Sequence, residues 1–252
     1  MNEKLFLNKG YIISKVENLK SLEYITKFIR NKIQNYSTQK TKNFSFNNTH
    51  KLIKKEKINH IRLKLIKQIN KDIKFRQSYF TLAKSNIFNI VGNELAMQKN
   101  INLSIQLPND DSSLLPLHSD TWSGDSPFET VLWVPLVDCY KTKSMFILES
   151  NKYDKFKKIY KKVKNTSSDN LHNKVKKDLK YLKVNYGKFL LFNQNLPHGN
   201  SINTTQETRI SLNCRFKGLF TPYKEKKIGE FFSPLIIKPA SKIGLKYKYP
   251  DQ

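Results

Sequence analysis

The chain has 252 residues, of which 38% are hydrophobic and 12% aromatic; this is ordinary for a globular protein, so we expect one domain over residues 1–252. No apolar run approaches the roughly eighteen residues of a membrane span, and the first residues lack the apolar core of a signal peptide, so we expect a cytoplasmic protein. A net charge as high as +26 usually indicates a protein that binds nucleic acid or anionic membranes. Here lysine outnumbers arginine 41 to 5, and Asn, Ile, Phe and Tyr are abundant, so biased amino-acid composition explains much of the charge.

The first third of the chain is predicted to be mostly helical. Residues 11–13 indicate a short strand. Apolar residues then recur at helical spacing in two runs flanked by lysines that would face water, namely Leu19, Leu22, Ile25, Phe28 and Ile29, followed by Ile58, Ile61, Leu65 and Ile69. We expect residues 1–93 to form helices that buttress the rest of the domain.

From about Glu94 the hydrophobic period changes to two, which is the period of a strand. Apolar residues at 101, 103, 105 and 107 alternate with polar ones, and we expect a β core over residues 94–217, followed by a C-terminal extension over 218–252. Later strands are predicted at Val131–Val134, Met145–Leu148, Lys188–Phe192 and Arg209–Phe216. Cys139 and Cys214 lie in apolar strand contexts without metal-binding spacing, so we expect buried free thiols.

A helical insertion is predicted at about residues 152–184. Apolar residues keep helical spacing on both sides of the polar break at 165–170, at Phe156, Ile159, Tyr160 and Val163 and then at Leu171, Val175, Leu179 and Leu182. Residues 151–188 carry a net charge of +10, whereas residues 101–150 carry −5. The lysines of the insertion are interpreted mainly as a solvated face; contact of one lysine row with a phosphate-bearing substrate is the alternative.

Two histidines and one aspartate suggest a catalytic iron site. His118 and Asp120 are two residues apart, so both can face one metal if the segment is strand-like, and His198 follows a buried strand eighty residues later. Two imidazoles and one carboxylate are the ligands of the facial triad that binds Fe(II) and leaves positions open for a cosubstrate and O2. Asp120 also favours oxygenation over halogenation, since a halogenating site needs the carboxylate position vacant for chloride.

Arg209 lies eleven residues after His198 in a run where Arg209, Ser211 and Asn213 alternate with apolar residues. A polar strand face that carries an arginine is suited to a small dianion, because the guanidinium binds a carboxylate with two parallel hydrogen bonds. We interpret 2-oxoglutarate as that dianion and assign Arg209 and Ser211 to its binding.

The segments around these residues resemble the iron(II)/2-oxoglutarate oxygenases of the phytanoyl-CoA dioxygenase type, closest to bacterial members found in sporadic carbohydrate-biosynthesis clusters. The likeness covers most of the chain, from the Gly-Tyr-Ile-Ile segment at 10–13 through the Leu-Pro-Leu-His-Ser-Asp segment at 115–120 to Arg209. It implies a mainly β fold with flanking helices, a double-stranded β-helix (jelly roll, cupin-like) with N-terminal buttressing helices and the helical insertion.

The resemblance also assigns residues to roles. His118, Asp120 and His198 match the iron ligands, and Arg209 matches the residue that pairs with the distal carboxylate of 2-oxoglutarate. Three further cosubstrate-binding positions match Gln106, Trp133 and Asn200. One departure concerns the Pro-Gly-Ser-His common in relatives, because residues 149–152 here read Glu-Ser-Asn-Lys, and the loop that follows is therefore expected to serve a different substrate.

The substrate is expected to be a small molecule, and the family likeness favours a sugar or nucleotide-sugar of surface-carbohydrate biosynthesis. Trp122, Asp125 and Ser126 follow the metal ligands directly and are candidates to contact it, although packing and a turn at 124–127 also explain them. Two alternatives stay open: an oxygenase acting on nucleic acid or another anionic substrate, which the scarcity of arginine counts against, and a non-catalytic binding protein on the same barrel.

Overall fold

The structure, a computed structural model, describes residues 2–36, 44–163 and 168–250. Its centre is a seven-stranded antiparallel sheet in the order β1-β7-β4-β9-β2-β10, with β3 also paired to β9, and a smaller antiparallel sheet has the order β6-β5-β8. The strands are β1 (Tyr11–Lys15), β2 (Leu95–Gln98), β3 (Asn102–Gln106), β4 (Glu129–Pro135), β5 (Met145–Leu148), β6 (Leu179–Tyr181), β7 (Lys188–Asn193), β8 (His198–Asn200), β9 (Arg209–Gly218) and β10 (Phe232–Ile236). The expected mainly β core with flanking helices is confirmed.

The alternation in the sequence decides which strand faces line the interior between the two sheets. In the β3–β9 pair, Asn102 lies opposite Asn213, and Gln106 lies opposite Arg209. Opposite residues of an antiparallel pair share one face, so the polar side chains of both strands gather there. The apolar side chains of Leu103 and the intervening positions are buried on the other face.

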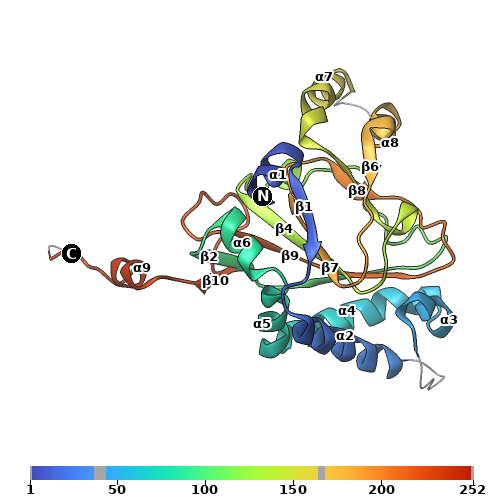
Figure 1. The fold of residues 1–252 in the computed structure, drawn as a ribbon, viewed down its shortest axis with the longest axis horizontal. Coiled ribbons are helices and arrows are strands. Elements are labelled where there is room, and N and C mark those ends of the chain that lie inside the picture. The colour runs from blue at the N-terminus through green and yellow to red at the C-terminus, as the bar shows by residue number, and fades with distance from the viewer. Residues whose placement is uncertain (1, 37–43, 164–167, 251–252) are drawn as a thin grey trace.

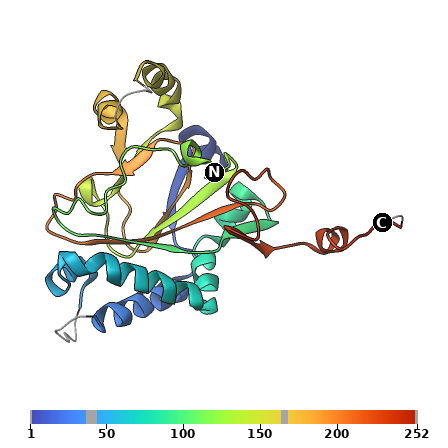
Figure 2. The same ribbon diagram turned by 180° about the vertical axis from the view of Figure 1, so that it is seen from behind.

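Helices cover the opposite face of the large sheet, as the sequence predicts (Figures 1 and 2). The N-terminal helices are α1 (Asn2–Lys9), α2 (Leu19–Gln34), α3 (Thr49–Leu52), α4 (Lys55–Lys71), α5 (Ile73–Thr81) and α6 (Lys84–Val91), with a 3-10 turn η1 (Phe46–Asn48). The predicted stripe on α4 is buried from Ile58 to Ile69. On α2 the predicted Leu22, Ile25 and Ile29 are buried and Phe28 is partly buried, but Leu19 is exposed because it lies in the first turn on the solvent side. Tyr79 of α5 is fully buried and donates a hydrogen bond from its hydroxyl to the Leu132 carbonyl of β4 (2.7 Å), which anchors the helical layer to the sheet.

The insertion contains the two predicted helices, but the second helix ends earlier than predicted. Helices α7 (Tyr153–Val163) and α8 (Ser168–Val175) lie over the small sheet (Figure 1). The predicted helical stripe does not continue to Leu182, because a 3-10 turn η5 (Lys176–Asp178) ends it and Leu179–Tyr181 form β6 against β5. The backbone hydrogen bonds offered by the free edge of β5 outweigh the local helical spacing. The predicted break at 165–170 overlaps residues 164–167, which lie outside the described residues.

The C-terminal extension first completes the large sheet and then leaves it. Strand β10 pairs with β2, and α9 (Pro239–Gly244) extends away from the body of the molecule (Figure 1). The remaining 3-10 turns are η2 (Asp120–Ser123), η3 (Lys141–Lys143) and η4 (Ser150–Lys152). Cys139 and Cys214 are buried free thiols, as predicted. Within the described ranges, no helix combines the length and apolar character needed to cross a bilayer.

Candidate metal centre and cosubstrate pocket

Two backbone hydrogen bonds bring His118 and His198 together. The amide of His118 donates to the His198 carbonyl (2.9 Å), and the amide of His198 donates to the His118 carbonyl (2.8 Å). His198 is the first residue of β8, so the segment around His118 continues the edge of the small sheet. The two imidazole rings lie side by side, with centroids 4.4 Å apart.

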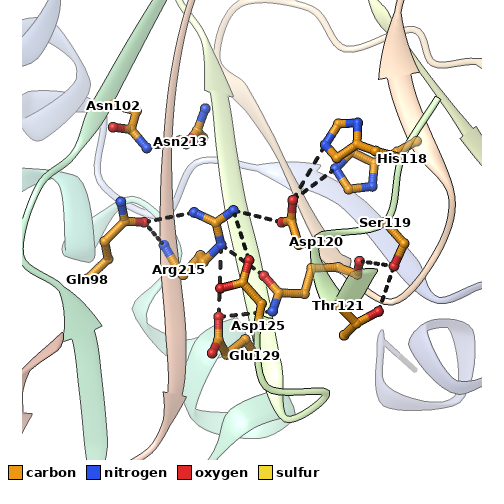
Figure 3. A network of polar contacts seen from close by, with 12 residues as sticks. Gln98, Asn102, His118, Ser119, Asp120, Thr121, Asp125, Glu129, Asn213 and Arg215 are labelled. Carbon is orange, nitrogen blue, oxygen red and sulfur yellow. Dashed lines mark hydrogen bonds and ion pairs between the residues drawn. The ribbon is translucent and has the colours of Figure 1, made fainter. Parts of the chain in front are cut away.

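The segment that carries the first two ligands is not a regular strand, which corrects the sequence prediction. His118 forms an isolated bridge and Ser119 is extended, but Asp120 is the first residue of the 3-10 turn η2. The Ser119 hydroxyl and the Thr121 hydroxyl share a hydrogen bond of 2.7 Å. The Ser119 hydroxyl also lies within donating distance of the carbonyls of Gln194 (3.2 Å) and Asn195 (3.1 Å). These bonds fix the turn, which directs Asp120 toward both imidazoles (Figure 3).

Both imidazoles present the same nitrogen to Asp120. Nδ1 of His118 lies 2.7 Å from the Pro116 carbonyl, and Nδ1 of His198 lies 2.8 Å from the Leu196 carbonyl. A carbonyl only accepts, so in each neutral ring Nδ1 carries the proton and Nε2 keeps its lone pair for a metal. The Asp120 Oδ1 atom lies 3.5 Å from Nε2 of His118 and 4.0 Å from Nε2 of His198. One ligand atom from each of the three residues lies within 4.8 Å of the others, so this donor set fits a metal ion.

The protonation states of His198 and Asp120 also favour metal binding. Burial lowers the pKa of His198 to about 4, so this ring is neutral at pH 7. Burial acts in the same direction on His118, but the hydrogen bonds that the ring donates to Asp120 and to the Pro116 carbonyl, together with the Asp120 charge, outweigh burial and raise the pKa of His118. Burial opposes ionisation of Asp120, yet the hydrogen bond that its carboxylate accepts from His118 and the nearby charge of Arg215 hold the pKa of its carboxyl well below the usual range. The carboxylate is therefore charged when a metal binds.

The triad forms part of the wall of a cavity of about 260 Å³ between the two sheets. Arg209 lines the same cavity and is only 3% exposed. Its Nη2 atom donates to Ser104 Oγ (3.2 Å), while its Nε atom has no hydrogen-bond partner. Among the described residues no carboxylate forms an ion pair with Arg209. A buried cation without a counter-charge is costly, so this cavity is suited to an anionic ligand.

The other predicted cosubstrate residues surround Arg209 at different depths. Trp133 and Asn200 line the cavity. Asn200 also holds a loop in place, because its Oδ1 accepts a hydrogen bond from the Leu115 amide (2.6 Å). Gln106 is fully buried opposite Arg209 and donates from Nε2 to the Ser201 carbonyl (2.7 Å). Ser211 is buried two residues after Arg209 on β9. Neither Gln106 nor Ser211 lines the cavity. Their cosubstrate roles stay predictions.

The three candidate substrate residues lie beside the metal turn but outside the cavity lining. Trp122 is 40% exposed and stacks on Tyr160 of α7, with ring centroids 5.1 Å apart. Asp125 is buried in an ion pair with Lys226 (2.6 Å), and Ser126 donates from Oγ to the Pro222 carbonyl (2.6 Å). In these contacts the three side chains pack against or bond to other parts of the protein, so a substrate-binding role for them stays a prediction.

Further lining residues were not assigned from the sequence. They include Arg215 and, on the polar faces of β3 and β9, Asn102, Ser104 and Asn213. The alternation of polar and apolar residues on those strands already placed them on one face, and this signal could have identified them. Two acids of the acidic segment 101–150 pair with lysines from elsewhere in the chain: Asp110 with Lys55 (2.9 Å) and Glu149 with Lys180 (3.1 Å).

Gly199 allows the close approach of the two histidine-bearing segments. A Cβ atom at Gly199 would lie 2.7 Å from the Leu115 carbonyl oxygen and 2.9 Å from that of Pro116. Backbone atoms cannot move aside cheaply, so we expect Gly199→Ala to separate the segments, lower the stability by about 1–3 kcal/mol and weaken metal binding. Gly244→Ala is the matched control, since its Cβ would meet nothing within 4 Å. Metal titration and thermal unfolding measure both effects; an unchanged metal affinity in Gly199→Ala would contradict the expectation.

Comparison with known proteins gives a shared fold at low identity. No protein-family model matches the sequence, and no curated protein matches it. Among solved structures, HygX from Streptomyces hygroscopicus with nickel and 2-oxoglutarate bound is 13% identical, with a TM-score of 0.54 over 90% of this chain and 89% of that chain. The non-heme monooxygenase ThoJ in its apo form is 12% identical (TM-score 0.52, 94% and 85% covered), and AviO1 from Streptomyces viridochromogenes Tue57 is 9% identical (TM-score 0.51, 88% and 96% covered). The chain is similar to these proteins in fold.

Proposed function

We propose that this protein is an Fe(II)- and 2-oxoglutarate-dependent oxygenase that hydroxylates or otherwise oxidises a small molecule. The observation that carries the proposal is one cavity with two complementary features: a two-histidine, one-carboxylate donor set, and the buried guanidinium of Arg209, which has no ion-pair partner among the described residues. A dianion that chelates a metal through one end and carries a carboxylate at the other satisfies both features. 2-Oxoglutarate has this chemistry, and HygX, which shares the fold, has been solved with nickel and 2-oxoglutarate bound.

In this proposal His118, Asp120 and His198 hold the metal, while Arg209 binds and orients the distal carboxylate. A ferrous ion bound there supplies the activation of O2 that is coupled to the decarboxylation of 2-oxoglutarate to succinate and CO2. The carbonyls of Pro116 and Leu196 accept hydrogen bonds from Nδ1 of His118 and His198 and so keep both imidazoles in the tautomer whose Nε2 can bind a metal. Phe192 and Met145 contribute apolar side chains to the wall of the same cavity.

Anaerobic addition of Fe(II) and 2-oxoglutarate tests the proposal directly. The chelate gives a weak visible charge-transfer band, and subsequent exposure to O2 yields succinate. A non-catalytic binding protein on the same fold gives neither result. Absence of both the band and succinate from metal-loaded, folded protein would overturn the proposal.

For the substrate we propose a sugar or nucleotide-sugar, in keeping with the resemblance to the oxygenases of carbohydrate-biosynthesis clusters. Small-molecule sites usually measure about 300–1,000 Å³, so a cavity of about 260 Å³ has little room beyond the cosubstrate. An adjoining cleft of about 420 Å³ shares four lining residues with it, namely Asn102, Ser104, Leu115 and Asn213. The amide and hydroxyl groups of Asn102, Ser104 and Asn213 are suited to a polyhydroxylated ligand. Stimulation of succinate formation by individual sugars and nucleotide-sugars over the substrate-free rate tests this choice.

A further inference from the structure

The two oxygens of Asp120 have different neighbours. Oδ1 faces Nε2 of His118 and Nε2 of His198, at 3.5 and 4.0 Å. Oδ2 instead lies 2.9 Å from Nη2 of Arg215, within range of a charge-assisted hydrogen bond (Figure 3). One oxygen is therefore directed to the metal position and the other is occupied by a guanidinium.

Arg215 is itself held in place from several sides. Its Nε atom donates to Gln194 Oε1 (2.9 Å), and its own amide donates to Gln98 Oε1 (3.1 Å). Two further carboxylates lie near the guanidinium, Asp125 at 3.7 Å and Glu129 at 3.9 Å. The Arg215 side chain is 15% exposed, and Asp125 and Glu129 are almost fully buried. Figure 3 shows these groups converging on Arg215, whose guanidinium cannot turn away from Asp120 without losing its contacts with Gln194, Asp125 and Glu129.

We propose that Arg215 is a positioning residue that restricts Asp120 to one-oxygen coordination of the metal and so keeps the opposite coordination positions available to the cosubstrate. A carboxylate with both oxygens free can bind a metal through either one or two of them. Two-oxygen binding would occupy a position that the facial triad leaves open. This inference rests on the proposed function, because it concerns the geometry of that same metal site.

No other cation among the described residues is placed to hold Asp120 as Arg215 does. Lys226 already pairs with Asp125 (2.6 Å), and in the described part of the chain Arg215 is the sole arginine or lysine that forms an ion pair with Asp120. Arg209 has no ion pair with Asp120 and belongs to the cosubstrate end of the cavity. Arg209 and Arg215 thus have separate tasks, although they lie only six positions apart on one face of β9.

Cobalt(II) titration of Arg215→Met and Arg215→Lys tests the positioning role without relying on turnover. In Arg215→Met we expect the visible Co(II) spectrum to change, because the coordination of Asp120 changes. Anaerobic titration of the cobalt protein is expected to show 2-oxoglutarate affinity reduced by about 10- to 100-fold, as is common for groups that orient metal ligands. Arg215→Lys retains the charge and is expected to recover part of both readouts.

Arg76→Met is the matched control, because Arg76 is a structural arginine outside the site. It donates to the carbonyls of Gln98 (2.7 Å) and Lys99 (2.9 Å), so its loss is expected to lower stability without changing the Co(II) spectrum. A wild-type spectrum and a wild-type 2-oxoglutarate affinity in folded Arg215→Met would overturn the positioning role. If Arg215→Met does not fold, a wild-type Co(II) spectrum and a wild-type 2-oxoglutarate affinity in Arg215→Lys would overturn the role instead, since a single ammonium group cannot reproduce all the guanidinium contacts. Failure of the wild-type protein to bind Co(II) and 2-oxoglutarate would overturn the proposed function and the inference together.

Discussion

His198→Ala is expected to abolish 2-oxoglutarate turnover while the protein stays folded. The substitution removes one of three metal ligands, and an open catalytic site with two remaining ligands holds the metal poorly. The backbone hydrogen bonds between residues 118 and 198 do not depend on the imidazole, so the two segments remain joined. Succinate formation with Fe(II) and 2-oxoglutarate measures the loss, and thermal unfolding verifies the fold. The same result is expected for His118→Ala and Asp120→Ala.

His60→Ala provides the control for the loss of a histidine. His60 is exposed on α4 and does not line the cavity. We expect this variant to retain turnover and stability. Near-normal succinate production by His198→Ala would remove His198 from the metal centre, whatever the behaviour of the control.

Arg209→Ala is expected to weaken 2-oxoglutarate binding far more than metal binding. Loss of a charge-assisted pair in a buried site costs on the order of 2 to 5 kcal/mol, which corresponds to roughly 30-fold to several thousand-fold in Kd. In the cosubstrate-free protein the same substitution removes a buried cation that no described carboxylate pairs with, so we do not expect stability to fall. Anaerobic titration of the Fe(II) protein with 2-oxoglutarate separates the two affinities.

The contacts of Arg215 exclude one explanation for an unchanged 2-oxoglutarate affinity in Arg209→Ala. Arg215 is engaged with Asp120 at 2.9 Å and with Gln194 at 2.9 Å, so it is poorly placed to take over a distal carboxylate. Arg209→Lys keeps the charge but loses the two-pronged geometry, and we expect an intermediate affinity. An unchanged 2-oxoglutarate affinity in Arg209→Ala would contradict the assignment of Arg209.

Much of the fold could be predicted because the signals are local. The two-residue alternation in β3 and β9 fixes which side chains share a face, and helical spacing fixes the buried stripe of α4. The end of the second insertion helix was predicted wrongly, for a reason that no local pattern contains. Leu179 keeps helical spacing with Val175, but pairing with Leu148 across the β5–β6 ladder decides its conformation. Hydrogen bonds to a distant strand outweigh a weak local preference.

The sequence by itself determined the identity and order of the candidate ligands and the strand face that carries Arg209. Those conclusions follow from side-chain chemistry and from periodicity, which are properties of neighbouring residues. Only the tertiary structure decided that Asp120 reaches the histidines from a 3-10 turn and that Arg215 is paired with it. It also decided that Arg209 is the buried arginine whose counter-charge no described residue supplies. Such pairings join residues far apart in the chain, and their electrostatic consequences depend on burial, which local sequence does not specify.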